Sequence, residues 1–485
     1  MTRHVTGVGA YVPRLFLPAS AYREAWGTGG PRGIDRTAVP DADEDAVTMG
    51  VEAATRALDA ASVDGDEIAH LAVATTTPPN DEEELCPRLA SLLGSTPETT
   101  RQYGGGTRAG VAAVAASCSD DRAVGGPALV VVADAPRGTP ESDEEAAAGA
   151  GAGAIVLDGV DDVDDGGSMT VDTVGEASDP VPGTRFRRRG RATTESVGIT
   201  QYEREAYKDT VADAVEALET DVAKVDAAAL TAPNGRLPYR VAGTVGLSTD
   251  QIAAGTVVSE TGDAGAAGPL LGLASALDAG STSVLLVGYG GGAGATALVL
   301  RGECPVEATL GGDVELTYPE YLRRRGTITG TEPEGGGAYV SVPSWRRTLP
   351  QRHRLVAGRC RACDALAFPP EGACHACGAL DGYDPSSLPG TGTVEAATVI
   401  GQGGAPPEFV EHQQRAGAFG VCVVAFDAPD GSDGDEAVSA PAQVVDSPAA
   451  TPSVGDRVVA VPRRIYEQEG VVRYGFKVVP VSARR

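Results

Sequence analysis

The first 300 residues alternate between two patterns of apolar side chains. In one pattern, apolar residues repeat at helical spacing, as within residues 46–61, where acidic residues precede the helix and complement its dipole. In the other, short continuous apolar runs are typical of strands that are buried on both faces. The patterns predict helices over residues 46–61, 107–116, 202–218, 270–277 and 318–325, and strands over residues 6–13, 68–75, 128–134, 149–157, 225–230, 283–289 and 297–300.

Two of these helices, over residues 107–116 and 270–277, consist almost entirely of small and aliphatic residues. A helix so poor in bulky polar side chains has to be buried against close neighbours. One lies in each half of the region, and both halves show the same alternation of strands and helices. The sequence therefore predicts a layered α/β domain built from a pseudo-repeat, with halves at residues 1–165 and 166–330. Asn80 and Glu83 also predict the capped start of a helix.

The last third of the chain has a different pattern, with short runs of alternating apolar and polar residues separated by Gly, Asp and Pro turns. Such runs over residues 390–400, 420–426, 458–461 and 471–479 predict a small β-barrel, assigned to residues 386–485. Residues 331–345 are predicted to form a linker and helix between the two regions.

Two CxxC pairs stand before the predicted barrel, formed by Cys360, Cys363, Cys374 and Cys377. Four thiolates in this spacing can surround one Zn²⁺ in a tetrahedron. The residues between the pairs contain turn formers and lack a helical period, which favours a zinc ribbon over residues 346–385. The alternative is a disulfide pair or a redox motif, although a redox CxxC normally occurs singly and opens a helix. Because four cysteines leave no open coordination position, the predicted zinc is structural.

The chain is strongly acidic, with 67 Asp and Glu residues against 39 Lys and Arg residues and a net charge of −28. This composition, with three lysines in all, is typical of halophilic proteins whose acidic surface holds water in high salt. The charge argues against nucleic acid as a partner. The acidic runs at residues 81–84 and 161–165 are interpreted as solvated loops rather than metal sites.

The sequence has neither a run of about 18 apolar residues nor a cationic start followed by an apolar stretch, and so predicts no membrane span and no signal peptide. The four cysteines outside the CxxC pairs are scattered, as expected in a reducing compartment. We therefore expect a cytoplasmic protein.

Several motifs of the first 330 residues occur together in one known superfamily. They are TGVGAYVP (6–13), VATTTP (73–78), ADAP (133–136), PNGR (233–236), LLGLASAL (270–277) and GYGGGAG (288–294). With them, this region resembles the thiolase superfamily, and in particular archaeal-type hydroxymethylglutaryl-CoA synthase and ketoacyl-ACP synthase III. The C-terminal region resembles the zinc-ribbon and OB-fold family known as domain of unknown function 35, through PQRHRL (350–355), the four cysteines, FPP (368–370) and VRYGFK (472–477).

The resemblance implies a thiolase-like α-β-α-β-α duplicated domain, followed by a rubredoxin-like zinc ribbon and an OB-fold β-barrel. It also implies coenzyme A or acyl-CoA as a ligand, and a homodimer or a heteromer with an active thiolase-superfamily enzyme. Family chemistry is a Claisen-type condensation, in which a Cys at a helix N-terminus takes the acyl group. A His together with an Asn or a second His steadies the enolate oxygen, and in the synthase a Glu acts as acid and base.

This sequence departs from the family pattern at every catalytic position. No histidine occurs between His70 and His353, so a shifted alignment supplies no base. A threonine hydroxyl is no substitute for the thiolate, because it stays protonated at neutral pH without a strong base. The family positions of nucleophile, His, Asn and Glu fall at Thr107 (or Gly106, with a shift of one residue), at Thr231, near Asp263 and near Pro79.

Cys118 is a second candidate for the nucleophile, because the surrounding Ala-Ser-Cys-Ser resembles a synthase motif. It falls at the C-terminal end of the small-residue helix, however, where the helix dipole raises the pKa of a thiol. The alternative is a small buried thiol.

Ligand binding could survive these losses. Arg185, Arg187, Arg188 and Arg189 form a basic stretch where the synthase family has a substrate-side loop, and guanidinium groups suit the phosphates of CoA. The alternative is a surface loop paired with acidic neighbours. In the barrel, Arg473, Tyr474 and Lys477 could likewise contact CoA or could serve packing.

Three functions are consistent with these observations. The first is an acyl-CoA-binding fusion protein that lacks condensing catalysis and acts as partner or scaffold of a thiolase-type enzyme in acyl-CoA, lipid or isoprenoid metabolism. The second is an active acyltransferase, similar to hydroxymethylglutaryl-CoA synthase, that uses residues such as Thr107 and Asp263. The third is a structural zinc and OB-fold assembly protein that binds no CoA.

Overall fold

The computed structural model describes residues 3–27, 30–119, 126–159, 167–328, 342–401, 409–429, 437–446, 452–468 and 470–484. The predicted acidic loop at residues 161–165 and most of the predicted linker lie outside these ranges. The chain divides into two compact units. Unit 1 comprises Met1–Asp41 and Asp45–Tyr321, and unit 2 comprises Ala42–Glu44 and Leu322–Arg485.

The centre of unit 1 is a sheet with the strand order β5-β4-β6-β7-β1-β8-β11-β10-β9, to which β12 adds by pairing with β1. β4, β5 and β6 run parallel, as do β9 and β10, whereas β7 is antiparallel to β1 and β6. The strands are β1 (His4–Tyr11), β4 (His70–Ala74), β5 (Thr99–Tyr103), β6 (Ala128–Asp134), β7 (Gly151–Asp158), β8 (Met169–Ser178), β9 (Ala227–Leu230), β10 (Ser283–Gly290), β11 (Gly294–Gly302) and β12 (Val306–Thr309).

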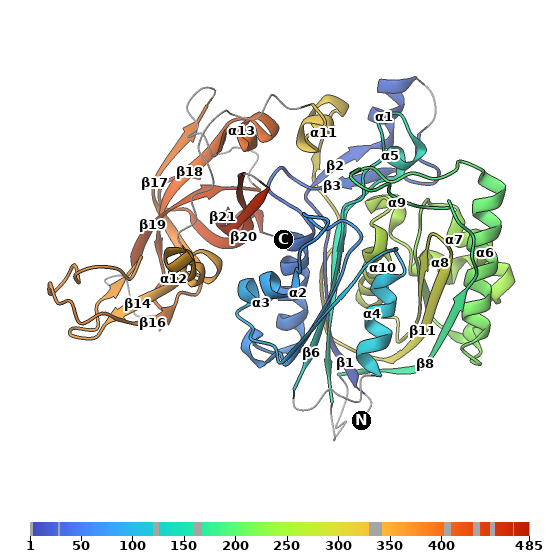
Figure 1. The fold of residues 1–485 in the computed structure, drawn as a ribbon, viewed down its shortest axis with the longest axis horizontal. Coiled ribbons are helices and arrows are strands. Elements are labelled where there is room, and N and C mark those ends of the chain that lie inside the picture. Colours follow the sequence, from blue (N-terminus) through green and yellow to red (C-terminus); the bar gives the residue numbers. More distant parts are fainter. Residues whose placement is uncertain are drawn as a thin grey trace. The chain divides into compact units, whose positions relative to one another are not determined.

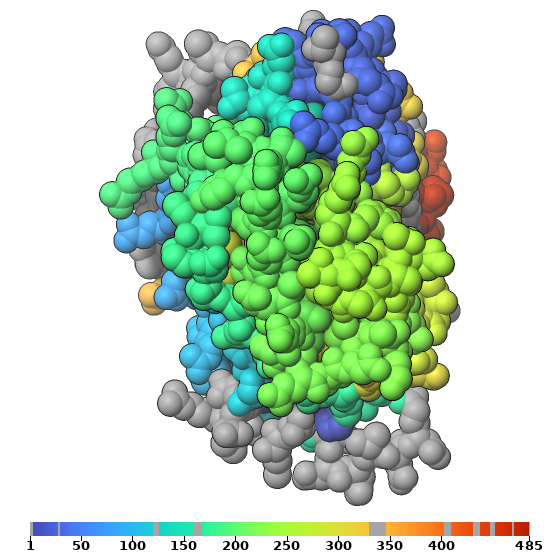
Figure 2. Space-filling model, turned by 90° about the vertical axis from the view of Figure 1, so that its right-hand side faces the viewer, coloured from blue at the N-terminus to red at the C-terminus, as the bar shows by residue number. Residues whose placement is uncertain are grey.

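Helices cover both faces of the two sheet halves and also lie between them (Figure 1). α4 (Ala109–Cys118) and α10 (Gly268–Asp278) form the central layer, α2 (Ala46–Ala61) and α3 (Cys86–Leu93) cover one outer face, and α6 (Thr200–Glu216), α7 (Leu237–Val245) and α8 (Thr249–Ala254) cover the other. Figure 2 shows the latter face, with α6, α7 and α8 in green to yellow-green. This is the predicted α-β-α-β-α arrangement.

Shorter elements complete unit 1. A small sheet has the order β13-β2-β3. Its strands and the remaining helices are β2 (Leu15–Pro18), β3 (Arg36–Val39), β13 (Val314–Glu315), α1 (Ala19–Trp26), α5 (Asp143–Ala147), α9 (Val258–Thr261) and α11 (Tyr318–Arg324), which contains the boundary between the units.

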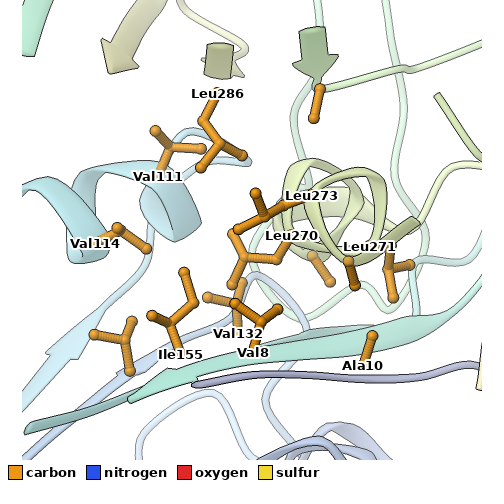
Figure 3. Close-up of a cluster of buried hydrophobic side chains, with 14 of the residues drawn as sticks. Val8, Ala10, Val111, Val114, Val132, Ile155, Leu270, Leu271, Leu273 and Leu286 are labelled. Carbon is orange, nitrogen blue, oxygen red and sulfur yellow. The ribbon is translucent and has the colours of Figure 1, made fainter. Parts of the chain in front are cut away.

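The central helices are made of small residues because their neighbours leave no room for larger ones. A Cβ added to Gly110 of α4 would lie 2.4 Å from the carbonyl oxygen of Ala266, and one added to Gly153 of β7 would lie 2.5 Å from the Cβ of Leu270. Figure 3 shows Leu270 and Leu273 of α10 directed towards the strands. Close packing of this kind is what the sequence predicted for both helices.

Most predicted elements of unit 1 are confirmed, and α2 and β6 have the predicted bounds. The helix predicted to start at Asn80 is wrong, because α3 begins at Cys86. The Asn80 side chain donates a hydrogen bond to Glu83 Oε2 (2.6 Å) instead of capping a helix. Helices α7 and α8 and strands β2, β3 and β8 were missed.

Unit 2 contains a three-stranded ribbon and a closed barrel. In the ribbon, β14 (Val356–Cys360) pairs antiparallel with β15 (Leu366–Ala367) and β16 (Tyr383–Ser387). The barrel has the order β17-β18-β19-β21-β20, in which β19 was not predicted. Its strands and the helices of the unit are β17 (Thr391–Ile400), β18 (Phe419–Phe426), β19 (Val438–Val444), β20 (Arg457–Gln468), β21 (Val471–Pro480), α12 (Val342–Arg354) and α13 (Val410–Ala416).

Candidate ligand-binding site and zinc ribbon

Unit 1 contains a cavity of about 280 Å³ on the side of α6 and α7. Its wall combines apolar side chains with paired charges, among them the ion pair between Arg32 and Asp143 (3.3 Å). Further lining residues that matter below are Arg185, Ser196, Asn234, Asp263 and Tyr289. Charged and polar residues make up much of the lining, so the cavity suits a polar small molecule.

Thr107 and Thr231, predicted at the family positions of the nucleophile and the histidine, lie together around the main chain of Tyr289. Thr107 lies two residues before α4, and its hydroxyl donates to the Tyr289 carbonyl oxygen at 2.5 Å. The Tyr289 amide donates to the Thr231 hydroxyl at 3.0 Å. Both threonines are almost fully buried (2% and 1% exposed). Tyr289 lines the cavity and the two threonines do not, so the nucleophile position is separated from the cavity by this residue.

Asp263 does line the cavity, but its carboxylate is already engaged. One oxygen accepts a hydrogen bond from the Gly265 amide (2.9 Å), and the other forms an ion pair with Arg185. Burial by itself would lower the pKa of Arg185, but the Asp263 carboxylate outweighs burial and raises it. The guanidinium is therefore charged, and together with the Asp263 carboxylate it forms a pair without net charge at the cavity wall.

Asp134, the last residue of β6, organises the loops around this region although it is fully buried. Its carboxylate accepts hydrogen bonds from the hydroxyls of Thr75, Thr76 and Thr77 at 2.8–3.0 Å. It also accepts from the amides of Thr76 (2.6 Å), Thr77 (3.1 Å) and Ala266 (2.7 Å). No role was predicted for Asp134 from the sequence. A signal was present, because Asp134 ends β6 and the Thr triplet 75–77 follows the neighbouring parallel strand β4.

The four arginines of the basic stretch have different surroundings. Arg185 lines the cavity, and Arg187 donates to the carbonyl oxygen of Thr76 at 2.5 Å. Burial lowers the pKa of Arg187 although Asp134 opposes this. Arg188 is exposed and pairs with Glu195 at 3.0 Å, and Arg189 is exposed. Two of the four are thus committed inside unit 1, and Arg188 and Arg189 remain accessible to a ligand.

The cysteines of unit 1 have the properties of buried thiols. Cys118 is the last residue of α4, is 6% exposed, and has its pKa raised to about 12 by burial. Burial also raises the pKa of Cys86 to about 11. A thiol with such a pKa is almost wholly protonated at neutral pH and is a poor nucleophile. Pro79, near which the family Glu is expected, lies in the loop between β4 and α3, and this loop also contains the acidic residues 81–84.

The four cysteines of the ribbon converge. Their sulfur atoms all lie within 4.8 Å of one another, with 3.8 Å between Cys360 and Cys377 and 3.6 Å between Cys363 and Cys374. Four sulfurs around one zinc ion at Zn–S distances of about 2.3 Å stand about 3.8 Å apart. The cluster therefore fits a tetrahedral ion. Each CxxC turn is closed by a backbone bond, from Asp364 to the Cys360 carbonyl and from Gly378 to the Cys374 carbonyl, both at 2.8 Å.

Arg473, Tyr474 and Lys477 of β21 are buried inside unit 2. Lys477 is fully buried and pairs with Asp43 at 2.7 Å. Their surroundings are those expected of packing residues, which is one of the two alternatives given for them.

In the described part of the chain, no helix combines the length and the apolar character that crossing a membrane requires.

Known proteins match the zinc ribbon and about two thirds of the chain. A family model described as ChsH2, rubredoxin-like zinc ribbon domain, matches residues 347–381. Hydroxymethylglutaryl-CoA synthase of Methanopyrus kandleri is 30% identical over 350 residues, which are 66% of this chain and 96% of the relative. The chain belongs to the hydroxymethylglutaryl-CoA synthase family. The corresponding enzyme of Aeropyrum pernix is also 30% identical, over 67% of this chain and 94% of the relative.

Solved structures agree with the fold. A hydroxymethylglutaryl-CoA synthase complexed with CoA has a TM-score of 0.59 at 16% identity, covering 70% of this chain and 95% of that one. The ketoacyl-ACP synthase III of Pseudomonas aeruginosa has a TM-score of 0.56 at 20% identity, covering 63% and 100%. Unit 1 thus has the fold of this family.

Proposed function

We propose that the protein is an acyl-CoA-binding member of the hydroxymethylglutaryl-CoA synthase family that lacks condensing catalysis and serves as partner or scaffold of an active thiolase-type enzyme. The observation that carries the proposal is the state of Thr107. Its hydroxyl is buried, donates to the Tyr289 carbonyl and does not line the cavity. A hydroxyl in this position can neither lose its proton to a base nor reach an acyl group in the cavity.

The other catalytic positions support the same conclusion. Thr231 has no basic nitrogen, and its oxygen accepts from the Tyr289 amide. Asp263 is held in an ion pair with Arg185 and offers no donor to an enolate oxygen. Since the loss of one general base or oxyanion donor typically reduces a rate by about 10²–10⁴, the loss of all these groups together leaves little of the family reaction.

Retention of the cavity supports ligand binding. It keeps a volume of about 280 Å³ and polar groups at its wall, including Asn234 and Ser196. A relative has been solved in complex with CoA. Exposed Arg188 and Arg189 lie in the loop that contributes Arg185 to the cavity wall, and they can contact the phosphates of a bound CoA. In unit 2, the four cysteines bind one structural zinc ion.

The decisive experiment measures two quantities on the purified chain in molar KCl. The first is CoA release from acetyl-CoA, with and without acetoacetyl-CoA, and the second is CoA binding by isothermal titration calorimetry. We expect binding without turnover. Steady release that disappears in Thr107→Ala would establish an active acyltransferase with an unusual nucleophile, and absence of both release and binding would favour a structural protein.

The contribution of the accessible arginines is tested by Arg188→Ala/Arg189→Ala. Each charge-assisted contact that is lost weakens binding, and we expect the pair to weaken CoA binding about tenfold. Arg240→Ala, which removes an exposed arginine from α7, is the matched control and should leave the affinity unchanged. If the unmodified chain, the double variant and Arg240→Ala bind CoA with equal affinity, this loop is excluded from the CoA site.

A further inference from the structure

The acidic run at residues 41–45 has two separate roles in the structure. The sequence suggested that these acids all serve the N-terminus of α2. Asp45 does so, since its carboxylate accepts from the amides of Val47 (2.9 Å) and Thr48 (3.1 Å). Ala42–Glu44, in contrast, is an integral part of unit 2.

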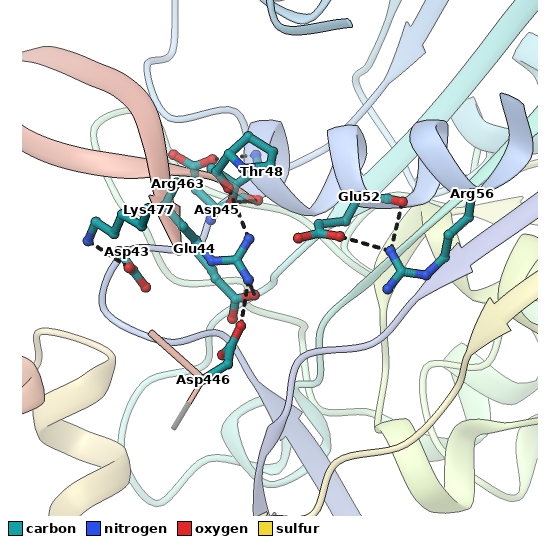
Figure 4. A network of polar contacts seen from close by, with 10 residues as sticks. Asp43, Glu44, Asp45, Thr48, Glu52, Arg56, Asp446, Arg463 and Lys477 are labelled. Carbon is teal, nitrogen blue, oxygen red and sulfur yellow. Dashed lines mark hydrogen bonds and ion pairs between the residues drawn. The ribbon is translucent and has the colours of Figure 1, made fainter. Parts of the chain in front are cut away.

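Within unit 2 this segment meets two buried cations of the barrel (Figure 4). Asp43 pairs with Lys477 of β21 at 2.7 Å, with side chains only 3% and 1% exposed. Glu44 lies 3.8 Å from Arg463 of β20, whose guanidinium also pairs with Asp446 at 2.8 Å. The Arg464 amide donates to the Asp43 carbonyl at 3.0 Å, so the main chain of the segment is bound as well.

The energetics of these contacts make the segment indispensable. Lys477 and Arg463 are among the most deeply buried side chains of the chain, and an ammonium or guanidinium taken out of water is costly unless a carboxylate accompanies it. Burial alone would raise the pKa of Asp43, but the attraction of Lys477 outweighs it and the pKa is lowered, so the carboxylate is ionised. The residues of the barrel and the acidic segment therefore form one electrostatic unit, although Asp43 and Lys477 are 434 positions apart.

We propose that the part of the β20–β21 hairpin that contains Arg463, Arg464 and Lys477 is a docking site for an acidic chain segment, that Ala42–Glu44 is its occupant in this protein, and that unit 2 reaches its native stability only with this segment bound. The β-barrel is then not a self-sufficient module, because two of its buried cations are matched by residues supplied from before α2.

Hydrogen exchange by mass spectrometry on the full chain in molar KCl tests the proposal. Asp43→Asn leaves Lys477 without its carboxylate, and we expect exchange in β20 and β21 to accelerate about 100-fold or more while β6 and β7 stay unchanged. Glu52→Gln is the matched control, because Glu52 and Arg56 form a similarly buried pair (2.9 Å) within α2 of unit 1. It should affect unit 1 and spare β20 and β21.

Two further variants keep the test decisive. In Asp43→Leu/Lys477→Met, apolar groups replace both charges. We therefore expect exchange in β20 and β21 to be much slower than in Lys477→Met alone and close to that of the unmodified chain. Glu44→Gln touches the longer contact and should give a smaller acceleration in the same strands, which serves if Asp43→Asn does not fold. Unchanged exchange in β20 and β21 in the Asp43 and Glu44 variants, or a double variant no better than Lys477→Met, would overturn the proposal.

Discussion

The zinc ribbon and the predicted catalytic positions of unit 1 differ in what their residues can do chemically. In the ribbon, four cysteines converge to the spacing of a tetrahedral ion. At the predicted catalytic positions, the main chain of Tyr289 brings Thr107 and Thr231 together, and both hydroxyls serve internal hydrogen bonds. The difference teaches that polar side chains which converge in a fold can either leave their ligand-binding atoms directed at one point or satisfy one another through the main chain.

The physical reason is that a structural metal site and a condensing active site make different demands on their side chains. A structural zinc site requires four ligands of the right type, and their spacing in sequence already limits what they can form. A condensing site requires a thiolate, a base and an oxyanion donor that are unsatisfied until substrate arrives. Thr107, Thr231 and Asp263 instead have partners within the chain, and such internal hydrogen bonds and ion pairs contribute to stability.

The largest expected effect is on the ribbon. In Cys374→Ser/Cys377→Ser, bound zinc should fall from one ion per chain to none and the ribbon should unfold, because zinc binding to such sites contributes on the order of 10 kcal/mol to folding. Metal analysis together with hydrogen exchange in β14 and β16 measures both effects. Cys304→Ser, which changes a cysteine of unit 1, is the control; retention of one zinc by the double variant would disprove the four-thiolate site.

The thiol of Cys118 should be inert, in contrast to the thiolates of the ribbon. Because its pKa is about 12, its thiolate fraction at pH 8 is about 1000-fold below that of an ordinary thiol, and the fraction rises only as the pH approaches 12. Alkylation followed by mass spectrometry should leave Cys118 unlabelled in the folded chain at pH 8 and label it fully in urea. Rapid labelling of Cys118 in the folded chain would instead support the hypothesis that Cys118 is the nucleophile.

Asp134 should behave as a structural anchor of the catalytic region. Asp134→Asn places an amide nitrogen against donors, and we expect unit 1 to lose about 3 kcal/mol of unfolding free energy. Urea unfolding in constant KCl measures this loss. Asp172→Asn, which removes a half-exposed partner of Arg301, should cost less than about 1 kcal/mol. Similar midpoints for the two variants would show that the hydrogen bonds of Asp134 contribute little.

The smallest expected effect is that of restoring the family nucleophile. Thr107→Cys should produce no CoA release, because the new thiol would be buried away from the cavity and would have no base. Thr107→Val, which removes the hydrogen bond to Tyr289, should cost about 1 kcal/mol of stability. Turnover by Thr107→Cys would contradict the difference between the ribbon and the residues around Tyr289, since it would show that these residues lack only the thiol for catalysis.

The sequence by itself determined the features that depend on local pattern or composition. The bounds of α2 and β6, the small-residue character of α4 and α10, and the pairing of the four cysteines into one cluster follow from periodicity, side-chain size and spacing along the chain. The absence of a histidine between His70 and His353 also follows from sequence, and it already argued against the family's chemistry.

Only the tertiary structure decided which polar residues meet. Thr107 and Tyr289 are 182 positions apart, Asp134 and Ala266 are 132 apart, and Asp43 and Lys477 are 434 apart. No local pattern encodes such partners, because a hydrogen bond or an ion pair depends on distances that arise when layers pack and a barrel closes. The role of the acidic run at residues 41–45 shows this most directly, since neighbouring carboxylates of one run serve a helix cap in unit 1 and two buried cations in unit 2.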